Sequence, residues 1–189
     1  HREDRRHPEA RRLPLSAASP ALPVCTLEVV IMNAIATPQR KVAIIASHGG
    51  LDEAYPSLIL ANAARQSGIE CFVFFTFWGL DIVTESKVDH LHVNLAGNAS
   101  STMPTMIAGL PGMESLAAKM MKKQMEELEL PTVREMLEIL DEAGAELYGC
   151  ELAMKMFKRS KEDLVPQVKD VITAGDFYDL AENAQIIFT

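Results

Sequence analysis

Cysteine is the residue type in this sequence best suited to covalent chemistry, and it occurs at Cys25, Cys71 and Cys150. Cys150 directly follows an expected strand and precedes an expected helix over residues 151–157. Free N–H groups and the positive end of a helix favour a thiolate over a thiol there. A helix end contributes up to about 1 kcal/mol, which raises the thiolate fraction at pH 7 from roughly 3% to roughly 14%. Cys150 is therefore a modestly activated candidate nucleophile, and Glu151 beside it opposes the effect.

The other two cysteines have no expected catalytic role. Cys71 stands at the start of its strand, at the opposite edge of the sheet from Cys150, so we interpret it as a core residue. Cys25 lies in an atypical N-terminal stretch. None of the three belongs to a CxxC pair, so neither a disulfide framework nor a zinc knuckle is indicated. The alternative for Cys150 is that it, too, is a small buried hydrophobe.

Small and polar residues follow the other expected strands. His48-Gly49-Gly50 follows the first strand, and Trp78-Gly79 follows the second. Open α/β sheets bind their ligands at the carboxyl ends of the strands. We therefore expect one site around Cys150, lined by His48, Gly49, Gly50, Trp78, Gly79 and Gly149.

The histidines and glycines allow more than one interpretation. His48 could handle a proton or contact an anion, or it could be a partly buried histidine with its hydrogen bonds satisfied. Gly49-Gly50 permits a tight turn and an anion at the next helix, although no phosphate-loop motif is present. His90 and His92 have no third ligand at a clear spacing, so a solvated strand face is favoured over a metal site. We expect neither a metal nor a cofactor.

The segments that position these residues alternate between strand and helix. Residues 41–47 and 69–77 are short and almost wholly apolar, which is typical of strands buried on both faces of a parallel sheet. A helical pattern between them ends at Gly68, so the unit predicts a right-handed parallel crossover. The whole pattern indicates an α/β sandwich with helices on both faces of a mostly parallel sheet. Further strands are expected at 145–149 and 185–188, and a last helix at 176–184.

The middle of the chain is harder to assign. Residues 88–95 alternate like a half-exposed strand, or they form a loop, and residues 97–112 have the composition of a long loop. The methionine-rich helix expected over 113–128 is interpreted as a core helix, with an oligomer interface second and a membrane-surface helix third. A capping box at Thr132 opens the next helix, which should bury Val133, Met136, Leu137 and Leu140.

Composition excludes several classes of protein. The 189 residues are 48% hydrophobic and 23% charged, which suits one globular domain. The net charge of −8 would repel nucleic acid and anionic lipid, so nucleic acid is not an expected partner and peripheral membrane contact is disfavoured. No apolar run approaches the ~18 residues of a membrane span. The unpaired cysteines favour a reducing, cytoplasmic location.

Residues 1–31 differ in composition from the rest. They contain five arginines, four prolines and no lysine. We interpret them as a disordered or non-native N-terminal extension that precedes a single domain over 32–189. The alternative is an export signal, but two prolines and a glutamate interrupt its apolar core.

Several segments together resemble the DsrE/DsrF-like sulfur-relay family, and most closely its branch of peroxiredoxin-like DsrE proteins. The resemblance runs from about Lys41 to Thr189, and the methionine-rich block with the cysteine segment is its most specific part. The matching segments are VAIIASHGG (42–50), FTFWGL (75–80), MPTMIAGLPGMESLAAKMMKKQM (103–125), LYGCELAM (147–154), KEDL (161–164) and IIFT (186–189).

The resemblance implies a three-layer α/β/α fold with a mostly parallel five-stranded sheet. It also implies persulfide chemistry on one cysteine, which maps to Cys150, and sulfur donor and acceptor proteins as partners. Relatives of this kind form homo-oligomers, as trimers or hexamers. A peroxidase role fits poorly, because peroxidatic sites carry Thr or Ser three residues before the cysteine and Leu147 stands there in this chain.

The function expected from the sequence is therefore that of a sulfur carrier or sulfurtransferase. Cys150 would accept sulfane sulfur as a persulfide and pass it to a partner thiol. Two alternatives stay open at this point: a non-catalytic module that binds an anion or nucleotide at the strand ends, and an oligomeric scaffold in which Cys150 is inert.

Overall fold

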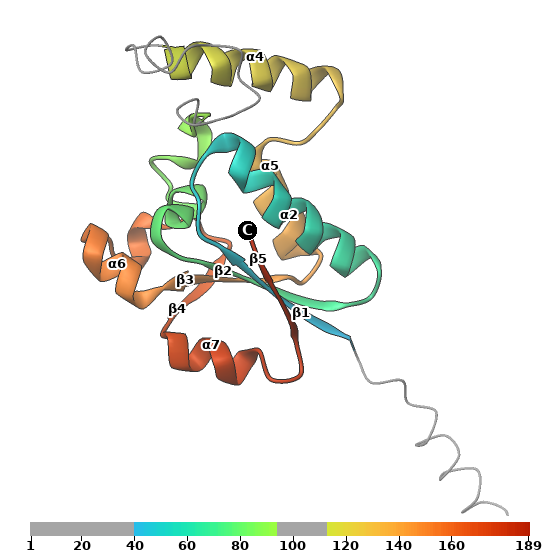
Figure 1. Ribbon diagram of the computed structural model, residues 1–189, viewed down its shortest axis with the longest axis vertical. Helices are drawn as coiled ribbons and strands as arrows, with labels where there is room; N and C mark the ends of the chain where they lie inside the picture. The colour runs from blue at the N-terminus through green and yellow to red at the C-terminus, as the bar shows by residue number, and fades with distance from the viewer. Residues whose placement is uncertain (1–39, 94–112) are drawn as a thin grey trace, which may run out of the picture. The chain divides into compact units, whose positions relative to one another are not determined.

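The computed structural model describes residues 40–93 and 113–189 (Figure 1). The expected N-terminal extension 1–31, with Cys25 and the alternative export signal, lies outside these residues, and so does the expected loop 97–112. The boundary at residue 32 therefore stays a prediction.

Five strands form one parallel sheet with the order β4-β3-β2-β1-β5 (Figure 1). This arrangement confirms the predicted α/β class and the five-stranded sheet. The crossover between the first two strands is parallel, as the strand–helix–strand unit predicted. The strands are β1 (Lys41–Ala46), β2 (Glu70–Phe75), β3 (Glu146–Cys150), β4 (Val168–Ile172) and β5 (Gln185–Phe188).

Helices cover both faces of the sheet and make three layers. Figure 1 shows α2 (Leu51–Gln66) and α5 (Val133–Glu142) on one face and α7 (Ala174–Leu180) on the other. The ring of Phe177 in α7 packs 5.7 Å from Phe72 and 5.1 Å from Phe74. Because side chains alternate along a strand, Val73 and Phe75 of β2 point to the α2 face. Almost all of β1 and β2 is consequently buried, which explains their apolar runs.

The structure adds one strand to the sequence-based expectation and decides between two alternatives for another segment. The edge strand β4 was not predicted, because its polar pair Lys169-Asp170 interrupts a short apolar run. Of the two alternatives for residues 88–95, the loop is correct over the described residues 88–93: η2 (Val88–His90) is a single 3-10 turn, and an extended segment follows it. The His90 amide closes this turn by donating to the Lys87 carbonyl at 2.7 Å.

The helix α5 forms as its capping box predicted. The Thr132 hydroxyl accepts a hydrogen bond from the Glu135 amide, and the Glu135 carboxylate accepts one from the Thr132 amide. The buried side chains are Val133, Met136, Leu137 and Leu140, as expected.

The helix α4 (Met113–Glu127) packs against the core along one side only. Ala117, Met121 and Met125 pack against the core, whereas Met120 is exposed. Leu128, just beyond the helix, is exposed as well. The core interpretation is therefore correct for one side of the helix only. In the two described stretches, no helix combines the length and apolar character needed to cross a membrane.

Two glycines allow the exit of β1 to lie directly against the 3-10 helix η1 (Phe77–Val83). A Cβ at Gly79 would stand 2.1 Å from the Ala46 carbonyl oxygen, and one at Gly49 would stand 2.3 Å from the Trp78 carbonyl oxygen. The Gly79 amide donates to the carbonyl of Ser47. These backbone contacts hold the carboxyl ends of β1 and β2 together.

Substitution of Gly79 by Ala should lower the free energy of unfolding by about 2–3 kcal/mol, because the new methyl group meets backbone atoms that have no room to move. Gly175→Ala is the matched control: its nearest contact would be ordinary, 3.5 Å from Thr173 Oγ1, and a helical Ala should gain up to about 1 kcal/mol. Urea unfolding measures both, and a Gly79→Ala chain as stable as the parent would contradict the close approach.

Candidate functional site

The carboxyl edge of the sheet carries the predicted site residues, as expected. His48 follows β1, Trp78 follows β2 and Cys150 ends β3. β2 lies between β1 and β3, and neighbouring strands are ~4.8 Å apart, so the exits that carry His48 and Cys150 are separated by about 10 Å.

A pocket of about 630 Å³ lies at this edge beside the start of α2. Its walls combine the predicted His48, Gly49, Gly50 and Trp78 with residues that were not predicted, chiefly Glu53, Asp81 and Lys87. Among the described residues, its lining does not include Cys150, Gly79 or Gly149. The single site expected from the sequence is therefore two separate places.

The first turn of α2 is not free to receive an anion. The Gly50 amide donates to the Glu53 carboxylate at 3.1 Å, and the Leu51 amide donates to the His92 carbonyl at 2.9 Å. The carboxylate also places a negative charge at the helix start, where an anion would have to lie. The anion site considered at Gly49-Gly50 is thus disfavoured.

The three histidines of this edge line the pocket without gathering into a cluster. His48 Nδ1 lies 2.9 Å from the Ser47 hydroxyl. His90 closes η2 and His92 lies in the extended segment after it, so they do not share a strand face as expected. In residues 40–93 and 113–189, no three His, Cys, Asp or Glu side chains are arranged to hold a metal ion.

Trp78 joins the pocket to α6 (Glu151–Phe157), the helix that begins after Cys150. Its indole is 59% exposed, and its centroid lies 4.9 Å from the ring of Phe157. The preceding Phe77 has φ +45°, a left-handed conformation that costs a bulky residue about 1–3 kcal/mol. Sequence reasoning missed this strain, since no pattern marks it.

A largely buried ion pair ties the same elements together. Arg159 donates to Asp81 at 2.5 Å and to the Thr84 hydroxyl at 2.8 Å, and Lys87 also contacts Asp81 at 2.8 Å. The side chains of Arg159 and Asp81 are only 12% and 16% exposed. Sequence reasoning could not find the pair, because its members lie far apart in the chain.

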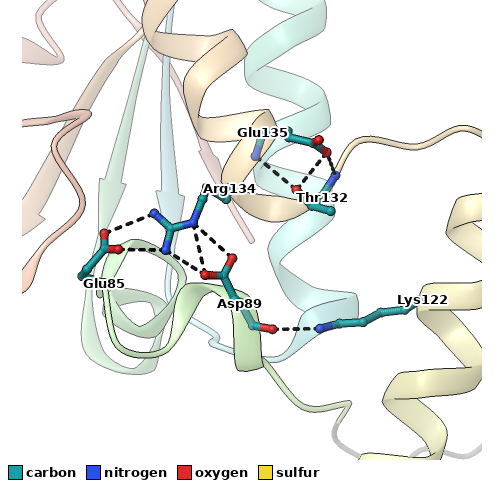
Figure 2. Close-up of polar contacts among 6 residues, drawn as sticks. All are labelled: Glu85, Asp89, Lys122, Thr132, Arg134 and Glu135. Atoms are coloured by element: carbon teal, nitrogen blue, oxygen red, sulfur yellow. Dashed lines mark hydrogen bonds and ion pairs between the residues drawn. The ribbon is translucent and has the colours of Figure 1, made fainter.

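A second ionic cluster fixes the outer wall of the pocket. Figure 2 shows the Arg134 guanidinium of α5 donating to Glu85 and to Asp89, which flank the pocket residues Ser86 and Lys87. The hydrogen bonds from Arg134 lower the pKa of Asp89 below its ordinary value. The same bonds to Asp89, together with those to Glu85, raise the pKa of Arg134. Lys122 of α4 donates to the Asp89 carbonyl at 2.9 Å (Figure 2).

Cys150 lies apart from the pocket, on the other side of the sheet. Alternation along β3 puts it on the face of Tyr148, whose ring meets Phe72 beneath α7. It precedes α6 directly, as predicted, but it is only 7% exposed and its sulfur accepts no hydrogen bond from the first turn of α6. Activation by the helix amides is therefore not observed, in contrast to the hydroxyl of Thr132, which does cap its helix.

The residues next to Cys150 add little charge at the sulfur. Glu151 pairs with Lys155 at 2.6 Å on the exposed side of α6. Gly149 points to the opposite face, where a Cβ would meet Leu164 and Leu80. The role of Gly149 is thus close packing on the α2 side of the sheet.

Cys71 is the core residue that the sequence predicted. Only 1% of it is exposed, and burial raises its thiol pKa to about 11, although the nearby Arg65 acts in the opposite direction. Cys71 and Cys150 are both free thiols.

Comparison with known proteins finds relatives over most of the chain. The model of the DsrE/DsrF/DrsH-like family matches residues 38–188. The sulfur carrier protein DsrE2 of Allochromatium vinosum is 33% identical over 156 residues, which are 78% of this chain and 96% of that protein. The protein YrkE of Bacillus subtilis is 21% identical over 154 residues, 79% of this chain and 96% of that protein.

One solved structure with a similar arrangement is that of the ychN protein from E. coli. It has a TM-score of 0.48 and 16% sequence identity, and the match covers 79% of this chain and 99% of that chain.

Alkylation should distinguish the two described cysteines. In the native chain Cys150 should react with iodoacetamide at least about tenfold faster than Cys71, because a pKa of about 11 leaves only about one Cys71 thiol in a thousand ionised at pH 8. The rate at Cys71 should rise as the pH approaches 11. Peptide mapping gives both rates, and the urea-unfolded chain is the control in which they converge. Equal rates in the native chain would show that Cys150 is as inaccessible as Cys71.

Breaking the buried ion pair between Asp81 and Arg159 should lower the stability of the fold. Asp81→Asn leaves the Arg159 charge without its partner and should lower the free energy of unfolding by about 2–3 kcal/mol. The double variant with Asp81→Asn and Arg159→Leu should lose less free energy of unfolding than the sum of the losses in the two single variants. Glu151→Gln, which breaks the exposed pair with Lys155, is the control and should change stability by less than about 0.5 kcal/mol. Additive losses at Asp81 and Arg159 would contradict the pairing.

Proposed function

Because this chain belongs to the DsrE/DsrF/DrsH-like family, we propose that it takes part in sulfur transfer as a carrier that holds sulfane sulfur on Cys150. The support from relatives is the 33% identity with a sulfur carrier protein over 78% of the chain. The observation within the molecule that carries the proposal is the position of Cys150 at the carboxyl end of β3, at the edge where sheets of this class bind their ligands.

The transfer is two successive exchanges at sulfur. The Cys150 thiolate attacks the outer sulfur of a donor persulfide, and the S–S bond of the donor breaks to release the donor thiolate. A thiolate of the acceptor protein then attacks the outer sulfur of the Cys150 persulfide, and Cys150 leaves as a thiolate. Each step forms one S–S bond and breaks another, so no external oxidant or reductant is needed.

The burial of Cys150 suits storage better than rapid attack. Only 7% of Cys150 is exposed, which limits how fast a donor can reach its sulfur. An S–S bond of about 2.05 Å carries the outer sulfur of a persulfide beyond the cysteine Sγ, so the loaded form reaches further toward a partner than the empty form does. Cys71 suits the role less, because its burial is nearly complete and its pKa is raised to about 11.

His48 and Trp78 do not fit the first expectation that they shape the mouth of the Cys150 site. They line a separate pocket of about 630 Å³, and this pocket favours a second candidate function, the binding of a small molecule. Its walls carry imidazoles, an exposed indole and apolar side chains, which suit a ring-containing ligand. A thermal-shift screen with nucleosides and other uncharged ring-containing molecules tests this candidate, since a ligand that binds only the folded chain raises its melting temperature.

The remaining features of the proposed function are expectations that follow from the same relatives. The partners are a sulfur donor protein and a sulfur acceptor protein, and the expected location is the cytoplasm. The assembly expected from the resemblance is a trimer or hexamer. Whether the chain is a passive carrier or accelerates transfer as a sulfurtransferase depends on the reactivity of Cys150.

Loading with sulfur is the direct test. Incubation of the full chain with polysulfide should add about 32 Da, the mass of one sulfur atom, and a reductant should remove it. Cys150→Ser should abolish the reducible adduct, because it removes the accepting sulfur. Intact-mass spectrometry measures the adduct.

Two control variants separate Cys150 from the other thiols. Cys71→Ser and Cys25→Ser should both keep the adduct. An adduct that survives in Cys150→Ser would overturn the assignment, and the absence of any adduct in the parent chain would favour the inert scaffold.

A further inference from the structure

The strand β5 lies at one edge of the sheet and pairs with β1 alone among the described residues. The Thr189 amide donates to Ile45 at 2.8 Å, and the Thr189 carbonyl accepts from the Ser47 amide at 3.1 Å. Backbone groups of successive residues point to opposite sides of a strand. Since Thr189 faces β1, the N–H and C=O groups of Ile186 and Phe188 point outward, to the open edge.

The side chains of the same two residues are also exposed. Ile186 is 47% exposed and Phe188 is 67% exposed. They align with Ala43 and Ile45, so they lie on the face of the sheet that α7 covers. The Phe177 ring of α7 packs over β2, away from this edge. Within residues 40–93 and 113–189, the edge of β5 therefore presents backbone groups without a partner strand, together with apolar side chains.

The opposite edge of the sheet is protected in a way that β5 is not. The edge strand β4 carries Lys169 and Asp170, which form ion pairs with Glu146 and Lys161. Charged side chains on an edge strand discourage pairing with another chain. Residues 183–189 of the β5 region carry no charged side chain. In the part of the chain that the structure describes, one edge of the sheet is thus blocked by charge and the other is left able to pair.

We propose that two copies of this chain pair through β5 in antiparallel orientation. The two-fold axis passes beside Ile187, so that Ile186 of each copy faces Phe188 of the other and the outward N–H and C=O groups are satisfied. The result is a continuous ten-stranded sheet with a closed, symmetric interface.

Charge and symmetry favour a second copy as the occupant of this edge. Each chain has a net charge of −8, so two copies repel each other least where both present an uncharged strand. Antiparallel self-pairing also places an apolar side chain opposite an apolar side chain on both sides of the axis, which stabilises the pair. This proposal does not depend on the chemistry of Cys150.

The test is the mass of the full chain in solution, by light scattering or sedimentation. The parent should have an even multiple of the chain mass of 20.8 kDa, because every copy pairs with a second one. Ile186→Pro removes one outward N–H group and no hydrogen bond to β1, so it should halve the assembly and leave the fold intact. Phe188→Lys should also halve the assembly, because it places a positive charge on the edge strand of each copy. Tyr178→Lys, at an equally exposed position on α7, is the matched control and should leave the mass unchanged.

Two further measurements make the outcome unambiguous. Slow alkylation of Cys71 in each variant shows that the monomer is still folded. Hydrogen exchange at the Ile186 and Phe188 amides should be slow in the assembled parent and fast on dilution, and the Phe188 amide should also exchange fast in Ile186→Pro. A hexamer that Ile186→Pro splits into trimers also supports the proposal, since a two-fold contact has been lost.

Several results would overturn the proposal. A monomeric parent would do so, and so would a three-fold ring, which contains no two-fold contact. An assembly that Ile186→Pro leaves unchanged would place the interface elsewhere. Slow exchange at Phe188 in a monomeric parent would show that another segment of the same chain pairs with β5.

Discussion

The close approach of two backbones at the carboxyl edge of the sheet is the constraint on which the candidate site depends. Gly79 lies against the Ala46 carbonyl, and Gly49 lies against the Trp78 carbonyl, so the exits of β1 and β2 cannot separate. This contact sets where η1 begins, and η1 in turn places Trp78 and Asp81 on the pocket wall. Any side chain at either glycine would push η1 away from β1, and the pocket would lose one of its walls.

The carboxyl edge of the sheet carries both the pocket and the thiol of Cys150, on opposite faces. The pocket lies beside α2, whereas Cys150 belongs to the α7 face of β3. The two places still share supports, because Trp78 packs on Phe157 of α6 and Asp81 binds Arg159 just beyond that helix. The sheltered position of Cys150 at a strand end suits the proposed role as a carrier, which holds sulfur between transfers. The imidazoles of His48, His90 and His92 line the pocket, and Cys150 does not.

Much of the fold was predictable from the sequence, because buried parallel strands leave a strong local signal. The apolar runs of β1 and β2 and the capping box at Thr132 depend on neighbouring residues alone, and all three were identified. The strand β4 was not predicted, because its edge position lets it carry the charged residues Lys169 and Asp170. The separation of Cys150 from the pocket was not predicted either. Residues near the strand ends point to one face of the sheet or the other, and the surrounding motifs do not show which. Ion pairs such as Asp81–Arg159 connect distant segments and leave no periodic pattern.

The position of Trp78 has a practical consequence. It is the only tryptophan in the 189 residues, and its indole lies between the pocket and Phe157 of α6. The intrinsic fluorescence of the unmodified protein therefore arises at the junction between the two candidate places. A change in its emission reports directly on the arrangement of that junction, without any attached dye.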